Sequence, residues 1–334
     1  MPSPRIVGHR PRSIVSLCRF GATGAHSTPS LTLDPEPMTD YIVALVGNHT
    51  ADLEFNTPVF LRSLHHLEDS NRTAVLLYHE GILPEYQLTF QAAAWPRPVH
   101  FPLIDFQDPP GFRGVPAFQK RSRFGYSHMI SFMFSGMVAR PELVDARYIL
   151  RMDTDSCFTG PMPNVFEHME RLGASYVANR DLDECGNIVK GMFDLARSFA
   201  KAHSVPFDAQ AISNDGGGEC VRGFFNNLEA LDSRRFRTSA IFAQWRDAVQ
   251  KDGGIYRQRW GDAQLRRISL MLMGLPHVRW SDLMPGRRAL LPYVHGVGCG
   301  GANPRVISQR VFGTPLKKAM SAIAERKKVG SDSG

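Results

Sequence analysis

The sequence lacks any run of about 18 apolar residues, the length that a membrane-spanning helix needs, so its 334 residues predict no transmembrane helix. None of the five cysteines stands in a C-x-x-C pair, which argues against a structural zinc site. Free thiols, or one or two disulfides with a cysteine left over, are the remaining possibilities. The P-loop pattern is also missing, although residues 213–218 form a glycine-rich turn.

A basic face suited to nucleic acid is absent as well. The net charge is +7, yet residues 1–25 hold four arginines without an acid and residues 302–334 carry a net +5. The two ends therefore account for more than the whole excess, and the body between them is near neutral. We expect no nucleic-acid partner. We also expect a basic leader at 1–38, one domain at 39–300 and a basic tail at 301–334.

Apolar runs of strand length alternate with segments of helical spacing along the body. Strands are expected at 41–46, 73–78, 99–104, 148–153, 175–179 and 277–280. Helices are expected at 53–68, 84–93, 122–138, 163–172, 189–203, 233–250 and 263–273. This order predicts an α/β fold with a mainly parallel central sheet flanked by helices.

Two carboxylates follow one of these strands. The run Tyr148-Ile149-Leu150-Arg151-Met152 leads directly into Asp153-Thr154-Asp155. Ligands of open α/β sheets bind just past the carboxyl ends of the strands. Two oxygen ligands at that place suit Mg²⁺ or Mn²⁺ carrying a diphosphate. The alternative is a turn stabilised by aspartate side chains, with no metal.

Several ordered stretches together resemble one family, the fungal-type α-1,2-mannosyltransferases, or glycosyltransferase family 15. The stretches are 123–129 (RFGYSHM) with 134–136 (FSG), 148–155 (YILRMDTD), 213–215 (SND), 226–229 (NNLE) and 253–263 (GGIYRQRWGDA). The resemblance covers roughly residues 40–296. The last stretch is the most specific, because eleven ordered positions rarely match by chance.

The resemblance implies a GT-A fold, the nucleotide-diphospho-sugar transferase fold, with GDP-mannose as donor and Mn²⁺ as cofactor. It implies transfer of mannose, with retention, to the 2-hydroxyl of a mannose on a glycan or glycoprotein acceptor. It also implies a place in the Golgi or secretory pathway.

Three metal ligands follow from the resemblance. Asp153 matches the first acidic residue of the family's metal motif, and Asp155 completes a D-x-D pair. His295 falls where the family places a late histidine ligand. Arg123, on the same expected helix as Tyr126, would clamp phosphate, so Arg123, Asp153 and Asp155 together would hold the donor diphosphate. The alternatives are a turn cap for Asp155, a structural role for His295 and a surface charge for Arg123.

Three further residues would act at the sugar. Tyr126 matches a family tyrosine beside the reacting mannose, and Glu229 matches the candidate nucleophile. Retention needs either such a carboxylate or an ion-pair path guided by the leaving phosphate, and both stay open. Asp262 would bind acceptor hydroxyls or act as a base. The alternatives are core packing for Tyr126, pairing with a structural arginine for Glu229 and a helix N-cap for Asp262.

Other functions use the same features. A second transferase on this scaffold would take another nucleotide sugar. A metal-dependent phosphohydrolase would use Asp153 as nucleophile and Asp155 as acid and base. An inactive homologue would only bind carbohydrate.

Overall fold

A seven-stranded sheet forms the centre of the domain in the computed structural model, which describes residues 39–69, 71, 73–107, 125–213, 216–283, 291–296 and 299. The strands, in sheet order, are β10 (His277–Arg279), β6 (Tyr176–Ala178), β9 (Leu228–Asp232), β4 (Ala146–Met152), β1 (Thr39–Val46), β2 (Ala74–His79) and β3 (Val99–His100). Only β9 runs antiparallel to its neighbours in this sheet. The expected α/β fold with a mainly parallel sheet is confirmed.

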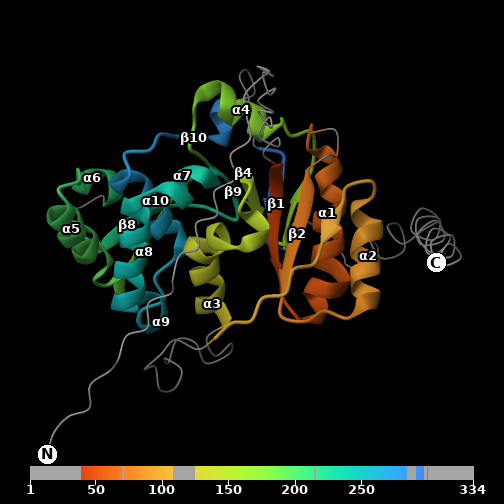
Figure 1. The fold of residues 1–334 in the computed structure, drawn as a ribbon, viewed down its shortest axis with the longest axis horizontal. Helices are drawn as coiled ribbons and strands as arrows, with labels where there is room; N and C mark the ends of the chain where they lie inside the picture. The colour runs from red at the N-terminus through yellow and green to blue at the C-terminus, as the bar shows by residue number, and fades with distance from the viewer. Residues whose placement is uncertain are drawn as a thin grey trace, which may run out of the picture. The chain divides into compact units, whose positions relative to one another are not determined.

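Helices cover both faces of the sheet (Figure 1). One face packs against α1 (Thr57–Ser63), α2 (Pro84–Ala94) and α4 (Val165–Leu172). The other packs against α3 (Gly125–Ser131), α5 (Met192–His203), α6 (Ala209–Ile212), α7 (Ser233–Thr238), α8 (Ala240–Asp252), α9 (Gly254–Arg257) and α10 (Asp262–Leu272). Successive residues of β4 alternate between the two layers, so apolar side chains lie on both faces of the strand.

Short 3₁₀ and π-helical segments accompany the α-helices. These segments are η1 (Asp52–Asn56), η2 (Leu64–His66), η4 (Phe132–Gly136), η5 (Met137–Ala139), η6 (Pro141–Leu143), η7 (Gly186–Val189) and η8 (Trp280–Leu283). The expected helix at 53–68 is thus η1, α1 and η2 in succession, and that at 122–138 is α3, η4 and η5 over its described part.

Two antiparallel ribbons stand outside the main sheet, and a disulfide secures each. β5 (Ser156–Phe158) pairs with β11 (Tyr293–His295), and Cys157 is bonded to Cys299. β7 (Asp181–Cys185) pairs with β8 (Cys220–Phe224), and Cys185 is bonded to Cys220. Of the two possibilities for the cysteines, the one with disulfide bridges is therefore confirmed; Cys18 lies outside the described residues.

Several strands and one helix differ from the expectations. β5, β7, β8, β9 and β11 were not predicted: β5 and β11 are only three residues long, and acids or glycines interrupt the apolar pattern of the other three. The expected strand at 99–104 keeps only the two residues of β3, and beyond it only an isolated bridge joins Leu103 to His79. The expected helix at 233–250 is two helices: Asp232 caps α7, and Ser239 caps the separate helix α8.

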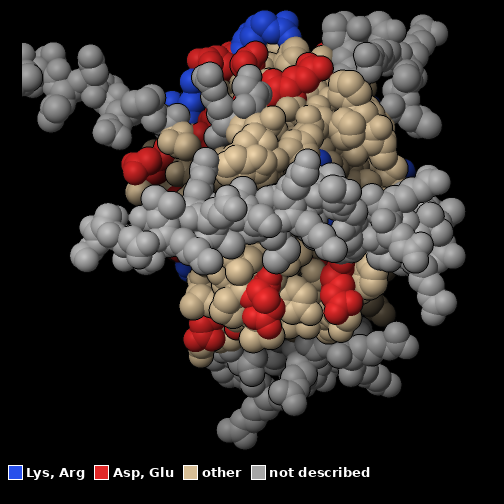
Figure 2. Space-filling model, turned by 90° about the vertical axis from the view of Figure 1, so that its right-hand side faces the viewer, with Lys and Arg blue, Asp and Glu red and all other residues tan. Residues whose placement is uncertain are grey.

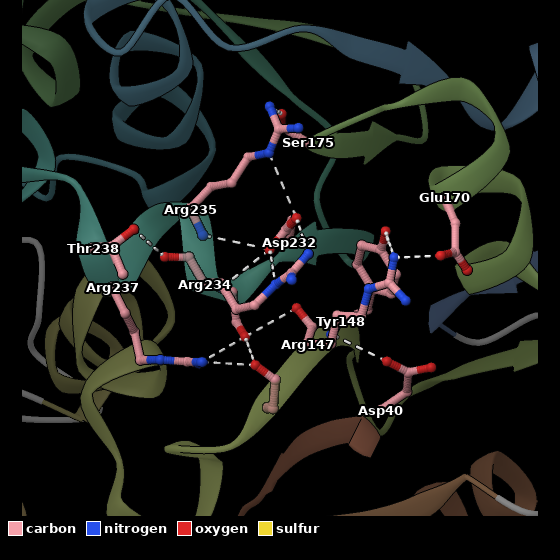
Figure 3. Close-up of polar contacts among 12 residues, drawn as sticks. Asp40, Arg147, Tyr148, Glu170, Ser175, Asp232, Arg234, Arg235, Arg237 and Thr238 are labelled. Carbon is pink, nitrogen blue, oxygen red and sulfur yellow. Dashed lines mark hydrogen bonds and ion pairs between the residues drawn. The ribbon is translucent and has the colours of Figure 1, made fainter. Parts of the chain in front are cut away.

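The starts of β4 and α7 are tied together by side chains, at the edge of the sheet opposite the Asp153 turn (Figure 3). Arg237 of α7 donates to the carbonyl oxygens of Leu143 and Ala146 at 2.9 and 2.7 Å. The Tyr148 N–H donates to the Asp40 carboxylate at 3.2 Å. These bonds fix where β4 begins, and hence where its carboxyl end lies.

The side of the domain that carries α1 and α2 bears scattered acidic groups and few Lys or Arg side chains over its described surface (Figure 2). Within the described ranges, no helix has both the length and the apolar character needed to cross a membrane.

Candidate active site

Asp153, Asp155 and His295 come together at the carboxyl end of β4. One ligand atom from each lies within 4.8 Å of the others. The β5–β11 ribbon delivers the histidine, since β5 follows Asp155 directly and pairs with the strand that ends in His295. The three residues expected to be metal ligands are therefore neighbours in space.

The two nitrogens of His295 face different partners. Nδ1 lies 3.2 Å from Asp155 Oδ1 and 3.0 Å from Ser156 Oγ. Nε2 lies on the other side of the ring, towards Asn227. The hydrogen bond to Asp155 raises the pKa of His295 above its ordinary value. Asp155 thus orients the imidazole, as carboxylates commonly do for metal-binding histidines, and leaves Nε2 as the nitrogen able to bind a cation.

The side chain of Asn227 lies between Asp153 and His295 and contacts both. Its Nδ2 donates to Asp153 Oδ2 at 2.7 Å and lies 3.1 Å from His295 Nε2. The Asp153 N–H in turn donates to the Asn227 carbonyl oxygen at 3.0 Å. An N–H donor contacting both ligand atoms marks a point where a cation would also be stabilised. A carboxylate oxygen and an imidazole nitrogen, with a second carboxylate behind the imidazole, suit Mn²⁺, so the residues present fit this metal.

Arg151 is buried next to this turn and forms ion pairs with three carboxylates. Its guanidinium lies 2.9 Å from Asp153 Oδ1, 2.6 Å from Asp262 Oδ2 and 3.5 Å from Glu229 Oε1. Burial, with the nearby carboxylates of Asp262 and Asp155, raises the pKa of Asp153 although Arg151 opposes this. No role was predicted for Arg151 from the sequence, although a cation within a mostly apolar strand is a signal of a buried charge pair.

Glu229 is completely buried. Its carboxylate accepts a hydrogen bond from the Tyr176 hydroxyl and lies 3.4 Å from Arg266 Nε, in addition to Arg151. This is the surrounding expected for a glutamate paired to structural arginines. Its assignment as a nucleophile stays a prediction.

Asp262 begins α10, and the cap position belongs to Gly261, so the expectation that Asp262 serves as an N-cap is wrong. Its Oδ2 accepts from Arg151 Nη1 and from Asn226 Nδ2, the latter at 2.7 Å. Two donors therefore share one oxygen of a carboxylate that is almost fully buried.

Tyr126 is 38% exposed, which rules out simple core packing. Arg259 donates to its hydroxyl at 3.3 Å, and the guanidinium carbon lies 4.7 Å from the ring centre. Arg259 itself has a φ of +71°, a strained value for a residue with a side chain, which is typical of functional sites. Partial desolvation raises the pKa of Tyr126. Arg123 lies outside the described residues, so its expected role is not placed.

A cleft of about 670 Å³ opens at the carboxyl end of β1. Its lining residues are Leu45, Val46, Gly47, Asn48, His49, Asp52, Glu80, Phe106, Gly125, Tyr126 and Met129. The parallel register pairs Val43 with Arg151, which brings Leu45 level with Asp153. The cleft and the Asp153 turn therefore occupy the same edge of the sheet, where ligands of such sheets bind.

A sequence profile of a known family covers much of this arrangement. The family described as "Glycolipid 2-alpha-mannosyltransferase" matches residues 115–280, which include Tyr126, Asp153, Glu229 and Asp262. This chain is similar to that family over about half of its length. The resemblance seen in the sequence is confirmed.

Two yeast relatives show that the sequence similarity is low. The O-glycoside alpha-1,2-mannosyltransferase omh1 of Schizosaccharomyces pombe is 25% identical over 154 residues, 44% of this chain and 39% of its own length. The probable mannosyltransferase KTR3 of Saccharomyces cerevisiae is 24% identical over 153 residues, 44% of this chain and 38% of its own length. The matched part spans about two-fifths of each relative.

Solved structures of family members share the fold. Core-mannan synthase A of Aspergillus fumigatus, in its Mn/GDP form, superposes with a TM-score of 0.61 at 18% identity over 70% of each chain. Ktr4p of S. cerevisiae, in complex with GDP, gives 0.62 at 18% identity over 71% of this chain and 67% of that one. The expected GT-A fold is confirmed.

Proposed function

We propose that this protein is a retaining α-1,2-mannosyltransferase that moves mannose from GDP-mannose to a mannose hydroxyl of a glycan or glycoprotein, with Mn²⁺ as cofactor. The observation that carries the proposal is the Asp153–Asp155–His295 cluster, on the same sheet edge as a cleft of about 670 Å³. The similarity to the family supports the mannosyl transfer. The Mn/GDP form of the A. fumigatus relative supports the metal and the nucleotide.

Asp153 Oδ2 and His295 Nε2 would hold the metal, with Asp155 keeping the imidazole in place. A bound Mn²⁺ supplies positive charge that stabilises the diphosphate as it leaves. Arg151 keeps Asp153 turned towards this point from below. Asn227 has to give up its bond to Asp153 or to His295 when the metal binds.

The cleft at the end of β1 would receive the nucleoside part of the donor. Asp52 and Glu80 line it, and carboxylates accept hydrogen bonds from base N–H groups and ribose hydroxyls but repel phosphate. The diphosphate would then point towards Asp153. This orientation places the transferred sugar near Tyr126, which lines the cleft and carries Arg259 over its ring.

Of the two retaining routes, the burial of Glu229 favours the ion-pair route. The carboxylate has no exposed surface and is held by Arg151, Arg266 and Tyr176. In the ion-pair route the leaving phosphate guides the acceptor hydroxyl, and Glu229 contributes negative charge below the site. Attack by Glu229 on the sugar would first require it to leave these partners.

The two disulfides favour an oxidising compartment, because cytosolic thiols are kept reduced. We therefore propose that the protein works in the secretory pathway, as Golgi mannosyl transfer would require.

Calorimetric titration of GDP-mannose into the full chain, with and without Mn²⁺, tests the proposal. We expect binding that needs Mn²⁺ and is lost in Asp153→Ala. If a panel of nucleotide sugars shows binding of a different donor, the protein is still a glycosyltransferase, but its donor is not GDP-mannose. Release of inorganic phosphate from simple esters would favour the phosphohydrolase, and binding without transfer would favour an inactive homologue.

A further inference from the structure

A second carboxylate, Glu184, borders the site from the β7–β8 ribbon. Glu184 pairs with Val221 across the ribbon, and the next residue, Cys185, is bonded to Cys220. Along β7, exposed and half-buried side chains alternate, and Glu184 is half-buried. The strand pleat therefore points Glu184 inwards and its neighbour Asp183 outwards.

The glycine before Asp262 leaves room for this carboxylate. A Cβ on Gly261 would lie 3.1 Å from Glu184 Oε2 and 2.5 Å from Gln264 Oε1. Glu184 thus lies against the backbone that presents Asp262. Gln264 is fully buried, and its amide makes no hydrogen bond with any described residue. The Glu184 carboxylate and the Gln264 amide can therefore both form hydrogen bonds with a ligand.

The surroundings of Glu184 match a sugar better than a phosphate. Its nearest charged influences are Arg259, which favours the anion, and Asp262, which disfavours it. Burial raises the pKa of Glu184. The negative charges of Asp262 and Glu184 both raise the pKa of Tyr126. Glu184 makes no hydrogen bond or ion pair within the described parts of the chain. Asp262, in contrast, already accepts two donors on Oδ2.

We propose that Glu184 is an acceptor-binding residue: its carboxylate accepts hydrogen bonds from hydroxyls of the sugar that receives mannose. The proposal rests on the proposed function and adds to it the side from which the acceptor enters. Arg259 and Tyr126 form the neighbouring wall, with the guanidinium over the phenol ring. The donor cleft lies at the ends of β1 and β2, so the two sugars would meet between Tyr126 and Asp262.

Steady-state kinetics of the full chain test this, with GDP-mannose, Mn²⁺ and methyl α-mannoside. Glu184→Gln keeps the size of the side chain and removes its charge. We expect the KM for methyl α-mannoside to rise about tenfold or more, the range of a lost hydrogen bond to a charged group. The KM for GDP-mannose should stay unchanged.

Asp183→Asn is the matched control, because Asp183 is the adjacent carboxylate on the outer face and pairs with Arg222 at 3.3 Å. It should leave both KM values unchanged. Glu184→Asp, which keeps the charge on a shorter chain, should restore part of the affinity for methyl α-mannoside. An unchanged acceptor KM in Glu184→Gln, or an equal rise in the donor KM, overturns the proposal.

Failure of the proposed function gives a different pattern. If the wild-type chain binds no GDP-mannose with Mn²⁺, the donor assignment fails whatever Glu184 does. Saturation-transfer NMR with methyl α-mannoside then tests Glu184 directly. Binding by the wild type that Glu184→Gln abolishes supports the residue, while equal binding by both, or binding by neither, overturns it.

Discussion

Arg151 and Glu229 lie directly opposite each other on the antiparallel strands β4 and β9, and both are buried. Each residue also has further ion-pair partners: Arg151 pairs with Asp153 and Asp262, and Glu229 pairs with Arg266. One cross-strand pair therefore fixes the positions of the carboxylates at the site.

Arg151→Met should be strongly destabilising, by about 3–5 kcal/mol, because it leaves buried carboxylates without their cation. Arg147→Met is the matched control on the same strand: Arg147 pairs with Glu170, whose side chain is 60% exposed. It should cost less than about 1 kcal/mol. Denaturant unfolding measures both. Equal small losses would show that Arg151 is not needed to compensate charge.

Asp153→Ala should abolish Mn²⁺-dependent binding of GDP with the fold intact. Asp155→Asn should weaken Mn²⁺ binding by about 10- to 100-fold, because Asp155 acts through the orientation of His295. Calorimetry and Mn²⁺ electron paramagnetic resonance measure these affinities. Complete loss in both variants would make Asp155 a direct ligand. Asp247→Asn, on an exposed carboxylate, is the control.

Glu229→Gln should cut turnover sharply while GDP binding is kept, since the charge below the reacting sugar is lost. Unchanged turnover would reject Glu229 as a catalytic group. Glu229→Ala with added azide separates the routes: formation of a mannosyl azide of inverted configuration would indicate that Glu229 attacks the sugar. No azide product is expected for the ion-pair route.

Loss of the Cys157–Cys299 disulfide should lower Mn²⁺ affinity, because this bond secures the ribbon that carries His295. Cys299→Ser is the test. The double variant Cys185→Ser and Cys220→Ser, in the other ribbon, should leave Mn²⁺ affinity unchanged. Equal affinity in Cys299→Ser and the wild type would show that the β5–β11 pairing holds His295 unaided.

Stability should fall as pH rises between about 4 and 6 through Asp40, the carboxylate beside Tyr148 in Figure 3. Burial raises the pKa of Asp40 to about 6 from 3.8, so the folded state holds this proton more tightly than the unfolded state. The contribution is complete below 3.8 and is lost above about 6. Asp40→Asn should therefore stabilise the protein at pH 7 by about 1 kcal/mol, allowing for solvent screening, and not at pH 3.5. Thermal melts at both pH values measure this, and an equal effect at both would exclude titration as the cause.

Apolar periodicity predicted the strands that are buried on both faces, because nothing competes with the hydrophobic pattern there. It missed β9, in which Glu229 and Asp232 interrupt the apolar run, and β7, which is acidic at three of its five positions. Glu229 and Asp232 are buried and bonded to other residues, and Glu184 of β7 is half-buried against Gly261. Local sequence carries no record of such partners.

The same reason divides the site. Asp153, Asp155 and His295 could be brought together from motifs, and the structure places them side by side. Arg151, Asn227 and Glu184 were given no role beforehand, since each depends on which residue lies opposite across a strand pair or against a glycine. The register between distant segments, and not residue type, determines their position.

The reversed direction of β9 has a consequence for how the site tolerates change. Asp153 leaves β4 and Asn227 leads into β9, so these two side chains meet across the seam between the two strands. Side chains along a strand point to alternate faces, and a slip of one residue in this seam would turn Glu229 into the opposite layer and bring Leu228 or Ala230 against Arg151. The geometry of the site therefore depends on the pairing of β4 with β9. Loops around the site can change in length, but the register that pairs Met152 with Leu228 cannot shift.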